Sequence, residues 1–162
     1  MDSIPTLDEP LSEASELTIP YILALDALEN ARRLYDALIP AEKAVKTEFW
    51  KEYSEDEELY GKKASLALYV ASGSRRIVPR EFQLKAVIAL CTGKDALVDV
   101  GTGYGKTFCM VLPALLSPGS ISLVVSPLKK LQEMQVIEFQ AYGILALAIN
   151  EDTPNDKNLW QV

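Results

Sequence analysis

The stretch Asp95–Leu116, DALVDVGTGYGKTFCMVLPALL, divides into three pieces with different residue patterns. After Asp95 comes the almost wholly apolar run Ala96–Val100, and glycine follows at alternate positions, Gly101, Gly103 and Gly105. Its last piece carries apolar residues at helical spacing. We therefore expect a strand, a tight turn and a helix in that order.

The glycine-rich turn has the residue types that bind phosphate. It ends in the Gly-Lys-Thr of a P-loop, although Val100 stands where the common pattern has glycine. Glycines let successive N–H groups point into one concavity, and the following helix adds the positive end of its dipole. Lys106 would reach the ATP phosphates, and the Thr107 hydroxyl would bind Mg²⁺. The predicted nucleotide site consists of Gly101, Thr102, Gly103, Tyr104, Gly105, Lys106 and Thr107. The alternative is a glycine-rich turn with an incidental lysine.

Length and composition exclude several classes of function. The chain has 162 residues, 49% of them hydrophobic and 24% charged, which suits one domain with a core. No apolar run approaches the roughly 18 residues of a membrane span, and the N-terminus does not resemble a signal peptide. Histidine is absent, which excludes histidine-based catalysis and metal sites. We expect an intracellular protein, nuclear if its source is eukaryotic, with no membrane partner.

Charge is distributed unevenly along the chain. Residues 1–60 hold 15 acidic and 5 basic side chains, whereas the remaining residues hold 8 acidic and 11 basic ones. The net charge of −7 therefore reflects an acidic first part, and it does not exclude nucleic acid as a partner of the second.

We predict three regions. Residues 1–17 form a disordered acidic tail, and residues 18–74 form a helical extension with helices at about 20–39, 40–53 and 57–71. Residues 18–71 pack on themselves or, alternatively, recruit a protein partner. Residues 75–162 form an α/β domain with a parallel sheet and flanking helices. Its predicted strands are 96–100, 121–125 and 144–149, and its predicted helices start at residues 79, 106 and 128.

Three stretches resemble the start of the first motor domain of RecQ-like superfamily 2 DNA helicases, of the DEAD/DEAH-box type. They are PREFQLKAVIALCTGKDALVDVGTGYGKTFCMVLPALL (79–116), LVVSPLKKLQEMQV (123–136) and YGILALAINEDTP (142–154). They keep the family's order over about half of the chain. The resemblance implies an incomplete RecA-like P-loop NTPase domain and an ATP-dependent 3′-to-5′ DNA helicase that uses Mg²⁺.

The resemblance also assigns residues around the predicted nucleotide site. In that family a glutamine upstream of the P-loop contacts the adenine edge, often with an arginine three residues before it. Gln83 and Arg80 hold these positions, whereas Pro79 replaces the usual aromatic residue. The alternative is that both are surface residues of a helix.

A second element of the resemblance points to nucleic acid. Ser126-Pro127-Leu128 resembles a helicase motif that holds the nucleic-acid backbone, a contact that positions a strand without reading its sequence. DNA, as a single strand or duplex junction, is the implied partner, and RNA is the alternative. The residues concerned are Ser126, Pro127, Leu128, Lys129, Lys130 and Gln135. The plainer interpretation is a capped helix with a solvated basic face.

The parts needed for ATP hydrolysis are not found in this sequence. Phosphoryl transfer requires an acidic metal site, which helicases place in a DExx sequence on a later strand. Asp56-Glu57-Glu58 and Glu151-Asp152 do not follow such a strand, and we interpret both groups as solvated charge. We expect a fragment or truncated product that binds ATP weakly without efficient hydrolysis. The alternatives are a non-catalytic interaction protein with a vestigial P-loop and a small nucleotide kinase.

Overall fold

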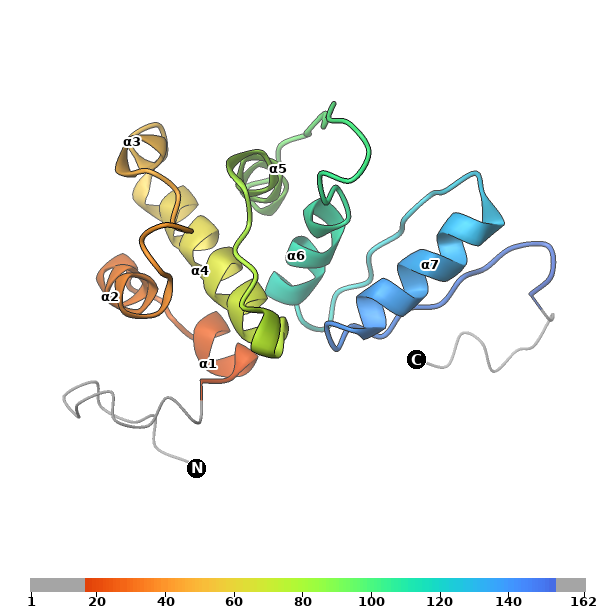
Figure 1. The fold of residues 1–162 in the computed structure, drawn as a ribbon, viewed down its shortest axis with the longest axis horizontal. Helices are drawn as coiled ribbons and strands as arrows, with labels where there is room; N and C mark the ends of the chain where they lie inside the picture. The colour runs from red at the N-terminus through yellow and green to blue at the C-terminus, as the bar shows by residue number, and fades with distance from the viewer. Residues whose placement is uncertain (1–16, 154–162) are drawn as a thin grey trace.

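The computed structural model describes residues 17–153, and all regular elements in this range are helices (Figure 1). Most of the predicted acidic tail, residues 1–16, and the stretch 154–162 lie outside this range. The elements are α1 (Ile19–Leu23), α2 (Leu28–Leu38), α3 (Thr47–Trp50), α4 (Glu55–Ala71), the 3₁₀ turn η1 (Gly73–Arg75), α5 (Glu81–Cys91), α6 (Phe108–Leu116) and α7 (Lys129–Gln140). None of these helices combines the length and hydrophobicity needed to cross a lipid bilayer.

The longest helix, α4, begins with a capping box. The Ser54 side chain accepts a hydrogen bond from the Glu57 backbone N–H at 3.3 Å, and the Glu57 carboxylate accepts one from the Ser54 N–H at 3.0 Å. Four acidic residues occupy the first turn, where the helix dipole favours negative charge. Local sequence therefore fixes the start of the element on which the other helices pack.

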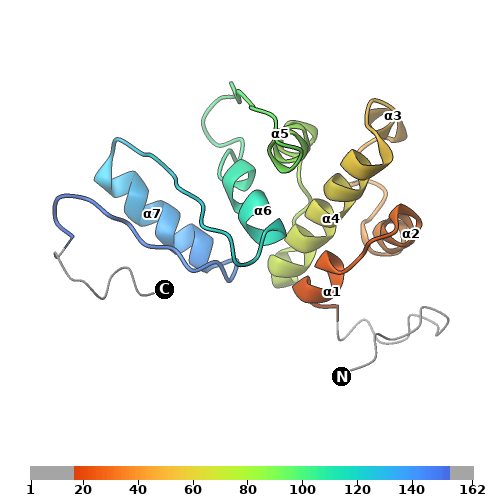
Figure 2. The same cartoon turned by 180° about the vertical axis from the view of Figure 1, so that it is seen from behind.

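Helix α4 lies between two groups of helices (Figures 1 and 2). Helices α1 and α2 pack on one side, and α5 and α6 pack on the other. Trp50 of α3 approaches the helix backbone so closely that a Cβ at Gly61 would lie 2.5 Å from its ring. Glycine at position 61 therefore allows this indole to pack directly on α4.

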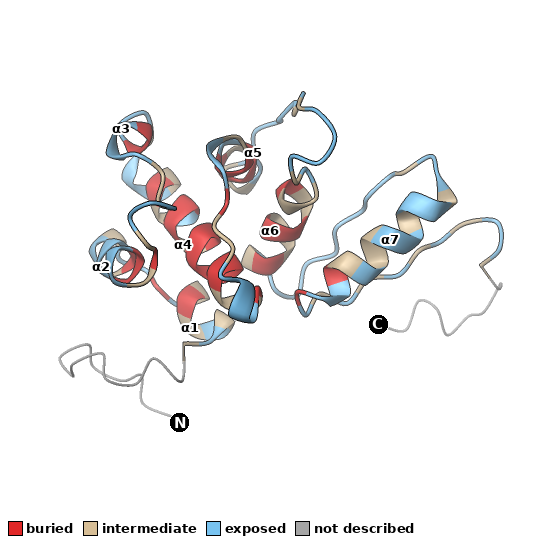
Figure 3. Ribbon diagram, viewed as in Figure 1, coloured by how far each residue is buried: buried red, intermediate tan, exposed pale blue. Residues whose placement is uncertain are grey.

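Two hydrophobic clusters form the core, one on each side of α4, and buried residues follow almost the whole of this helix (Figure 3). The first cluster contains Phe49, Trp50, Ala64, Leu68, Leu84, Val87, Ile88, Val111, Leu112, Leu115, Phe139 and Tyr142. The second contains Ile22, Leu25, Ala31, Leu34, Tyr35, Ile39, Leu66, Ala67 and Tyr69. The first cluster joins residues on both sides of the predicted boundary at residue 75. The division into domains stays a prediction.

The predicted α/β fold is wrong. Within residues 17–153 there is no strand, and the three segments predicted as strands, 96–100, 121–125 and 144–149, are irregular. Ile121, Leu123 and Val125 are 96%, 88% and 87% exposed. The apolar faces of α5 and α6, which the prediction placed on a sheet, pack on α4 instead, so no buried layer forms for strands to occupy.

The helix predicted over about 20–39 is interrupted. The chain leaves helical geometry after α1 and resumes it at Leu28, and α2 ends at Leu38 because Ile39 precedes Pro40 and adopts an extended conformation. Of the helix predicted over 40–53, only the short α3 forms. Helices α4 to α7 match their predicted positions to within about three residues.

Candidate nucleotide site

The glycine-rich loop connects α5 to α6 and has left-handed backbone at two of its glycines. The φ angles of Gly103 and Gly105 are +82° and +80°, a conformation that side chains with a Cβ rarely adopt. A Cβ at Gly103 would meet open space, whereas one at Gly105 would lie 3.0 Å from the Gln83 side-chain nitrogen. Gly105 is therefore constrained both by its own conformation and by its neighbour.

Gln83 connects this loop to the first turn of α5. Its Nε2 donates hydrogen bonds to the carbonyl oxygens of Gly105 at 2.8 Å and Tyr104 at 3.4 Å. Its Oε1 accepts a hydrogen bond from the Arg80 backbone N–H at 2.7 Å. The side chain is almost fully buried. Both ends of the amide that the resemblance assigned to adenine are thus bonded to protein groups in this structure.

Lys106 lies at the exposed mouth of the loop. Its Nζ donates hydrogen bonds to the carbonyl oxygens of Val100 at 2.8 Å and Gly101 at 3.1 Å. No hydrogen bond of normal geometry runs from the backbone N–H groups of residues 101–107 to any group in the described range. These N–H groups are donors available to an anion, and phosphate oxygens could replace the carbonyls at Lys106.

Two further predicted residues border the loop. Thr107 stands immediately before α6, and its hydroxyl makes no capping hydrogen bond. A single hydroxyl ligand suits Mg²⁺, which keeps several waters and takes its other ligands from substrate phosphates. Arg80 places its guanidinium carbon 5.5 Å from the centre of the Tyr104 ring, so both residues reach the same side of the loop.

The residues assigned to nucleic acid surround the start of α7. The Ser126 carbonyl accepts a hydrogen bond from the Gln132 side chain at 2.7 Å, whereas the buried Ser126 hydroxyl has no partner among the described residues. Leu128 precedes the helix without a side-chain cap, and Pro127 lies beside it, exposed. Lys130 is exposed, and Gln135 is half-buried. The sequence-assigned hydroxyl is therefore present but turned inward.

Lys129 forms ion pairs that the sequence did not predict. Its Nζ lies 2.5 Å from a Glu151 carboxylate oxygen and 2.6 Å from an Asp152 one. Hydrogen bonds to Asp152 and Glu151 raise the pKa of this ammonium group. Because Glu151 and Asp152 lie 22 and 23 positions after Lys129, only the folded chain reveals the cluster. It reduces the charge that Lys129 offers to a phosphate backbone.

The upstream acidic group is not fully solvated either. Glu58 is buried, and its two carboxylate oxygens accept hydrogen bonds from Arg32 at 2.9 and 2.6 Å. Glu57 pairs with Lys94 at 2.7 Å. The interpretation of these residues as solvated charge is therefore wrong for Glu58, which has a structural role on α4.

The structure brings the predicted residues together in two groups rather than one. Arg80, Gln83 and residues 101–107 form the first group, between α5 and α6. The second group lies at the start of α7, and Figures 1 and 2 show this end of α7 apart from the loop that precedes α6.

Comparison with known proteins matches this same part of the chain. A family model described as DEAD/DEAH box helicase matches residues 80–160. The chain is 44% identical over 78 residues to a putative ATP-dependent DNA helicase Q1 of Caenorhabditis briggsae. This match covers 48% of this chain and 12% of that protein. It is 44% identical over 71 residues to the ATP-dependent DNA helicase RecQ of Haemophilus influenzae, covering 44% of this chain and 11% of that one. It is 39% identical over 77 residues to the ATP-dependent DNA helicase Q1 of Rattus norvegicus, and this match covers 48% of this chain and 12% of that protein. The chain thus spans about one eighth of the length of these relatives. No solved structure matches it significantly.

Proposed function

Because this chain belongs to the DEAD/DEAH box helicase family, we propose that residues 101–107 bind the phosphates of ATP. The supporting observation is the loop itself, whose N–H groups are not engaged by the described protein groups. Lys106 lies at the mouth of the loop, where its ammonium group could exchange its two hydrogen bonds to carbonyl oxygens for charge-assisted hydrogen bonds to phosphate oxygens. The dipole of α6, which begins directly after the loop, favours the same ligand.

The remaining residues of the proposed site act from its edges. Thr107 would hold Mg²⁺, which neutralises phosphate charge when it is bound. Arg80 would approach the nucleotide from the side of the Tyr104 ring. Gln83 would act from beneath the loop, and it reaches adenine only if its hydrogen bonds to Tyr104 and Gly105 are exchanged for contacts to the base.

We further propose that the chain is the ATP-binding and DNA-binding part of a RecQ-type helicase of 3′-to-5′ polarity. The three relatives are named as ATP-dependent DNA helicases, and each matched segment includes less than half of this chain. The start of α7, Ser126 to Lys130 with Gln135, would contact the phosphate backbone of DNA. Lys130, which is exposed, would carry most of the positive charge of this contact because Lys129 is paired.

This chain is proposed to bind Mg·ATP without hydrolysing it efficiently. Hydrolysis requires a carboxylate near the metal and a residue that orients the attacking water. Four of the acidic residues named above form ion pairs instead: Glu57 with Lys94, Glu58 with Arg32, and Glu151 and Asp152 with Lys129.

Nucleotide binding to the purified chain tests the proposal. A fluorescent ATP analogue should bind in the presence of Mg²⁺, and Lys106→Ala should weaken binding by at least tenfold. Lys85→Ala, which removes the same charge from an exposed position on α5, is the matched control. Equal binding by the Lys106 variant and wild type would refute the site. A high ATPase rate stimulated by single-stranded DNA would refute the claim of inefficient hydrolysis and leave the binding site in place.

A further inference from the structure

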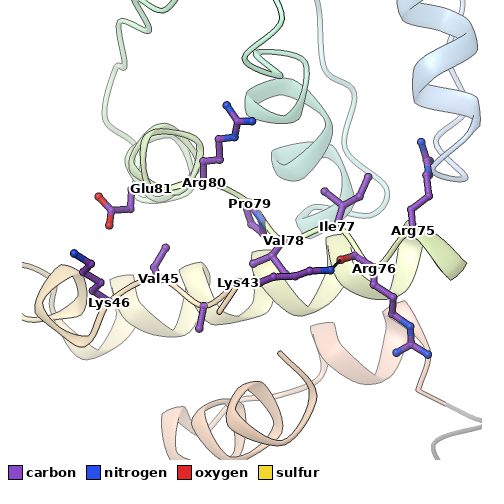
Figure 4. A pocket seen from close by; sticks show the side chains of 11 residues that line it. Lys43, Val45, Lys46, Arg75, Arg76, Ile77, Val78, Pro79, Arg80 and Glu81 are labelled. Carbon is purple, nitrogen blue, oxygen red and sulfur yellow. Dashed lines mark hydrogen bonds between the residues drawn. The ribbon is translucent and has the colours of Figure 1, made fainter. Parts of the chain in front are cut away.

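A basic groove lies between two segments that, apart from residues 79–81, precede the part of the chain matched to the family. We use this name for the surface pocket of about 560 Å³ lined by residues 43–46 and 75–81 (Figure 4). Glu81 is the only acidic residue among those that line it. Its basic residues are Lys43, Lys46, Arg75, Arg76 and Arg80. This local excess of positive charge contrasts with the net charge of −7 of the chain.

The backbone of the groove is fixed by contacts on both walls. Arg76 adopts a left-handed conformation with φ of +50°, which turns the chain after η1. The Lys43 ammonium donates a hydrogen bond to the Arg76 carbonyl oxygen at 3.4 Å and so joins the walls. The Ile77 N–H donates to the Ser72 hydroxyl at 2.8 Å, and Pro79 is buried beneath the groove. The basic side chains therefore project from an ordered frame.

The charges of the groove are not neutralised by the described part of the protein. All five basic side chains are exposed, and no salt bridge within residues 17–153 includes any of them. The three arginines lie against aromatic rings instead, at 5.2 Å for Arg75 on Tyr142, 5.0 Å for Arg76 on Tyr69 and 5.5 Å for Arg80 on Tyr104. Such contacts order a guanidinium group without removing its charge.

The directions of these side chains indicate the shape of a ligand. In Figure 4, Arg75 and Arg80 point to one side of the groove, Arg76 points to the opposite side, and Lys43 lies along the groove. A compact phosphate needs donors that converge on one point. Basic groups spread along a groove suit an extended polyanion, whose successive charges meet successive side chains.

We propose that the basic groove binds the sugar–phosphate backbone of a single nucleic-acid strand. The proposal rests on the proposed nucleic-acid binding of this chain, and it adds a contact surface separate from the start of α7. Four of its five basic residues precede residue 80, where the match to the family begins. Contacts of this kind would be sequence-independent and salt-sensitive, because binding releases counterions from the strand.

Binding of a fluorescein-labelled oligothymidylate to the full chain tests this proposal. The double variant Lys43→Gln/Arg76→Gln removes one lysine and one arginine from the groove. Affinity should fall roughly tenfold at about 0.1 M salt, and the slope of log K against log salt should decrease by about 1.4 in magnitude, or about 0.7 for each lost phosphate contact. Arg33→Gln/Lys51→Gln makes the same change at two exposed residues outside the groove and should leave both quantities unchanged.

The possible outcomes separate this proposal from the proposed function. If both double variants bind like wild type while Lys130→Gln weakens binding, the groove is refuted and the contact at α7 stands. If wild type does not bind the oligonucleotide, the groove and the DNA-binding part of the proposed function both fail, and ATP binding is judged by Lys106→Ala. If ATP displaces the oligonucleotide from wild type but not from the groove variant Lys43→Gln/Arg76→Gln, the groove is a nucleotide site and the proposal is refuted. If the variant that contains Arg76→Gln misfolds, the test is repeated with Lys43→Gln/Lys46→Gln, which changes only exposed side chains of one wall.

Discussion

The Gln83 side chain holds the Gly105 carbonyl by a hydrogen bond of 2.8 Å across the base of the glycine-rich loop. The same amide accepts a hydrogen bond from the Arg80 N–H, so one buried residue connects the start of α5 to the loop before α6. The geometry of the candidate site therefore depends on a residue that lies under it.

Replacing Gln83 by alanine should lower the free energy of unfolding by about 1–3 kcal/mol. The loss follows because the Gly105 carbonyl and the Arg80 N–H, both partly buried, are left without partners. Urea denaturation measures the change. Gln140→Ala, at an exposed position of α7, is the control and should have little effect. A Gln83 variant as stable as the control would show that these hydrogen bonds contribute nothing net.

Alanine at Gly103 and at Gly105 should have different costs. Each forces a left-handed residue with a Cβ, which costs about 1–2 kcal/mol. At Gly105 the Cβ also presses on Gln83 at 3.0 Å, whereas at Gly103 it meets open space. The midpoint temperature of thermal unfolding should therefore be highest for wild type, lower for Gly103→Ala and lowest for Gly105→Ala. The reverse order of the two variants would contradict the described loop conformation.

Lys62 should give the protein a component of stability that rises with pH. Its buried ammonium lies 3.7 Å from the Tyr35 ring centre and 4.5 Å from that of Trp50. Burial lowers the Lys62 pKa below its usual 10.5, and Asp36 and Glu58 oppose this effect only in part. Between the two pKa values the unfolded chain binds more protons than the folded one, so raising the pH stabilises the fold.

A comparison with Lys62→Met isolates this component. The unfolding free energy of wild type, relative to the variant, should increase as the pH rises from the lowered pKa of folded Lys62 towards the usual 10.5. Measurements up to about pH 9.5 stay below 10.0, the usual pKa of Tyr35 and Tyr53. Above that pH these phenols would lower stability, because burial raises their pKa in the folded state only. A relative stability that falls over this range would contradict the burial of the lysine.

The exposed segment 121–125 should make the protein bind apolar dyes and associate with itself. Ile121, Leu123 and Val125 are each at least 87% exposed, and adjacent apolar residues of this kind are a liability in solution. Ile121→Lys/Leu123→Lys should reduce both the fluorescence of a bound naphthalene sulfonate dye and self-association in sedimentation experiments. Ser120→Lys/Ser122→Lys adds equal charge and retains the apolar side chains, so its smaller effect would identify those side chains as the cause.

The sequence predicted features that depend on near neighbours. Helices α4 to α7 follow from spacing and flanking residues, and the left-handed turns at Gly103 and Gly105 follow from residue type. Gln83 and Lys129 show the limit of such reasoning at the candidate site. Their partners are Gly105 for the first and Glu151 with Asp152 for the second, and no local pattern connects these residues.

The predicted sheet failed for a similar reason. A mostly apolar run of five residues, such as Ile121–Val125, becomes a buried strand only if other segments pair with it and helices cover it. In this chain the faces of α5 and α6 that could cover such a strand are occupied by α4. The competition between α4 and a sheet for these faces is not visible in any single stretch of sequence.

Helix α4 contributes to both hydrophobic clusters, so the helices before residue 72 and the segment around the loop should gain or lose order as one cooperative unit. A ligand bound at residues 101–107 would stabilise this whole unit, because it binds only the folded form. It would therefore slow hydrogen exchange even in α1 and α2, which lie outside its site. Conversely, a substitution that loosens the Trp50–Gly61 contact would reduce the fraction of molecules able to hold nucleotide, even though every residue of the loop is intact.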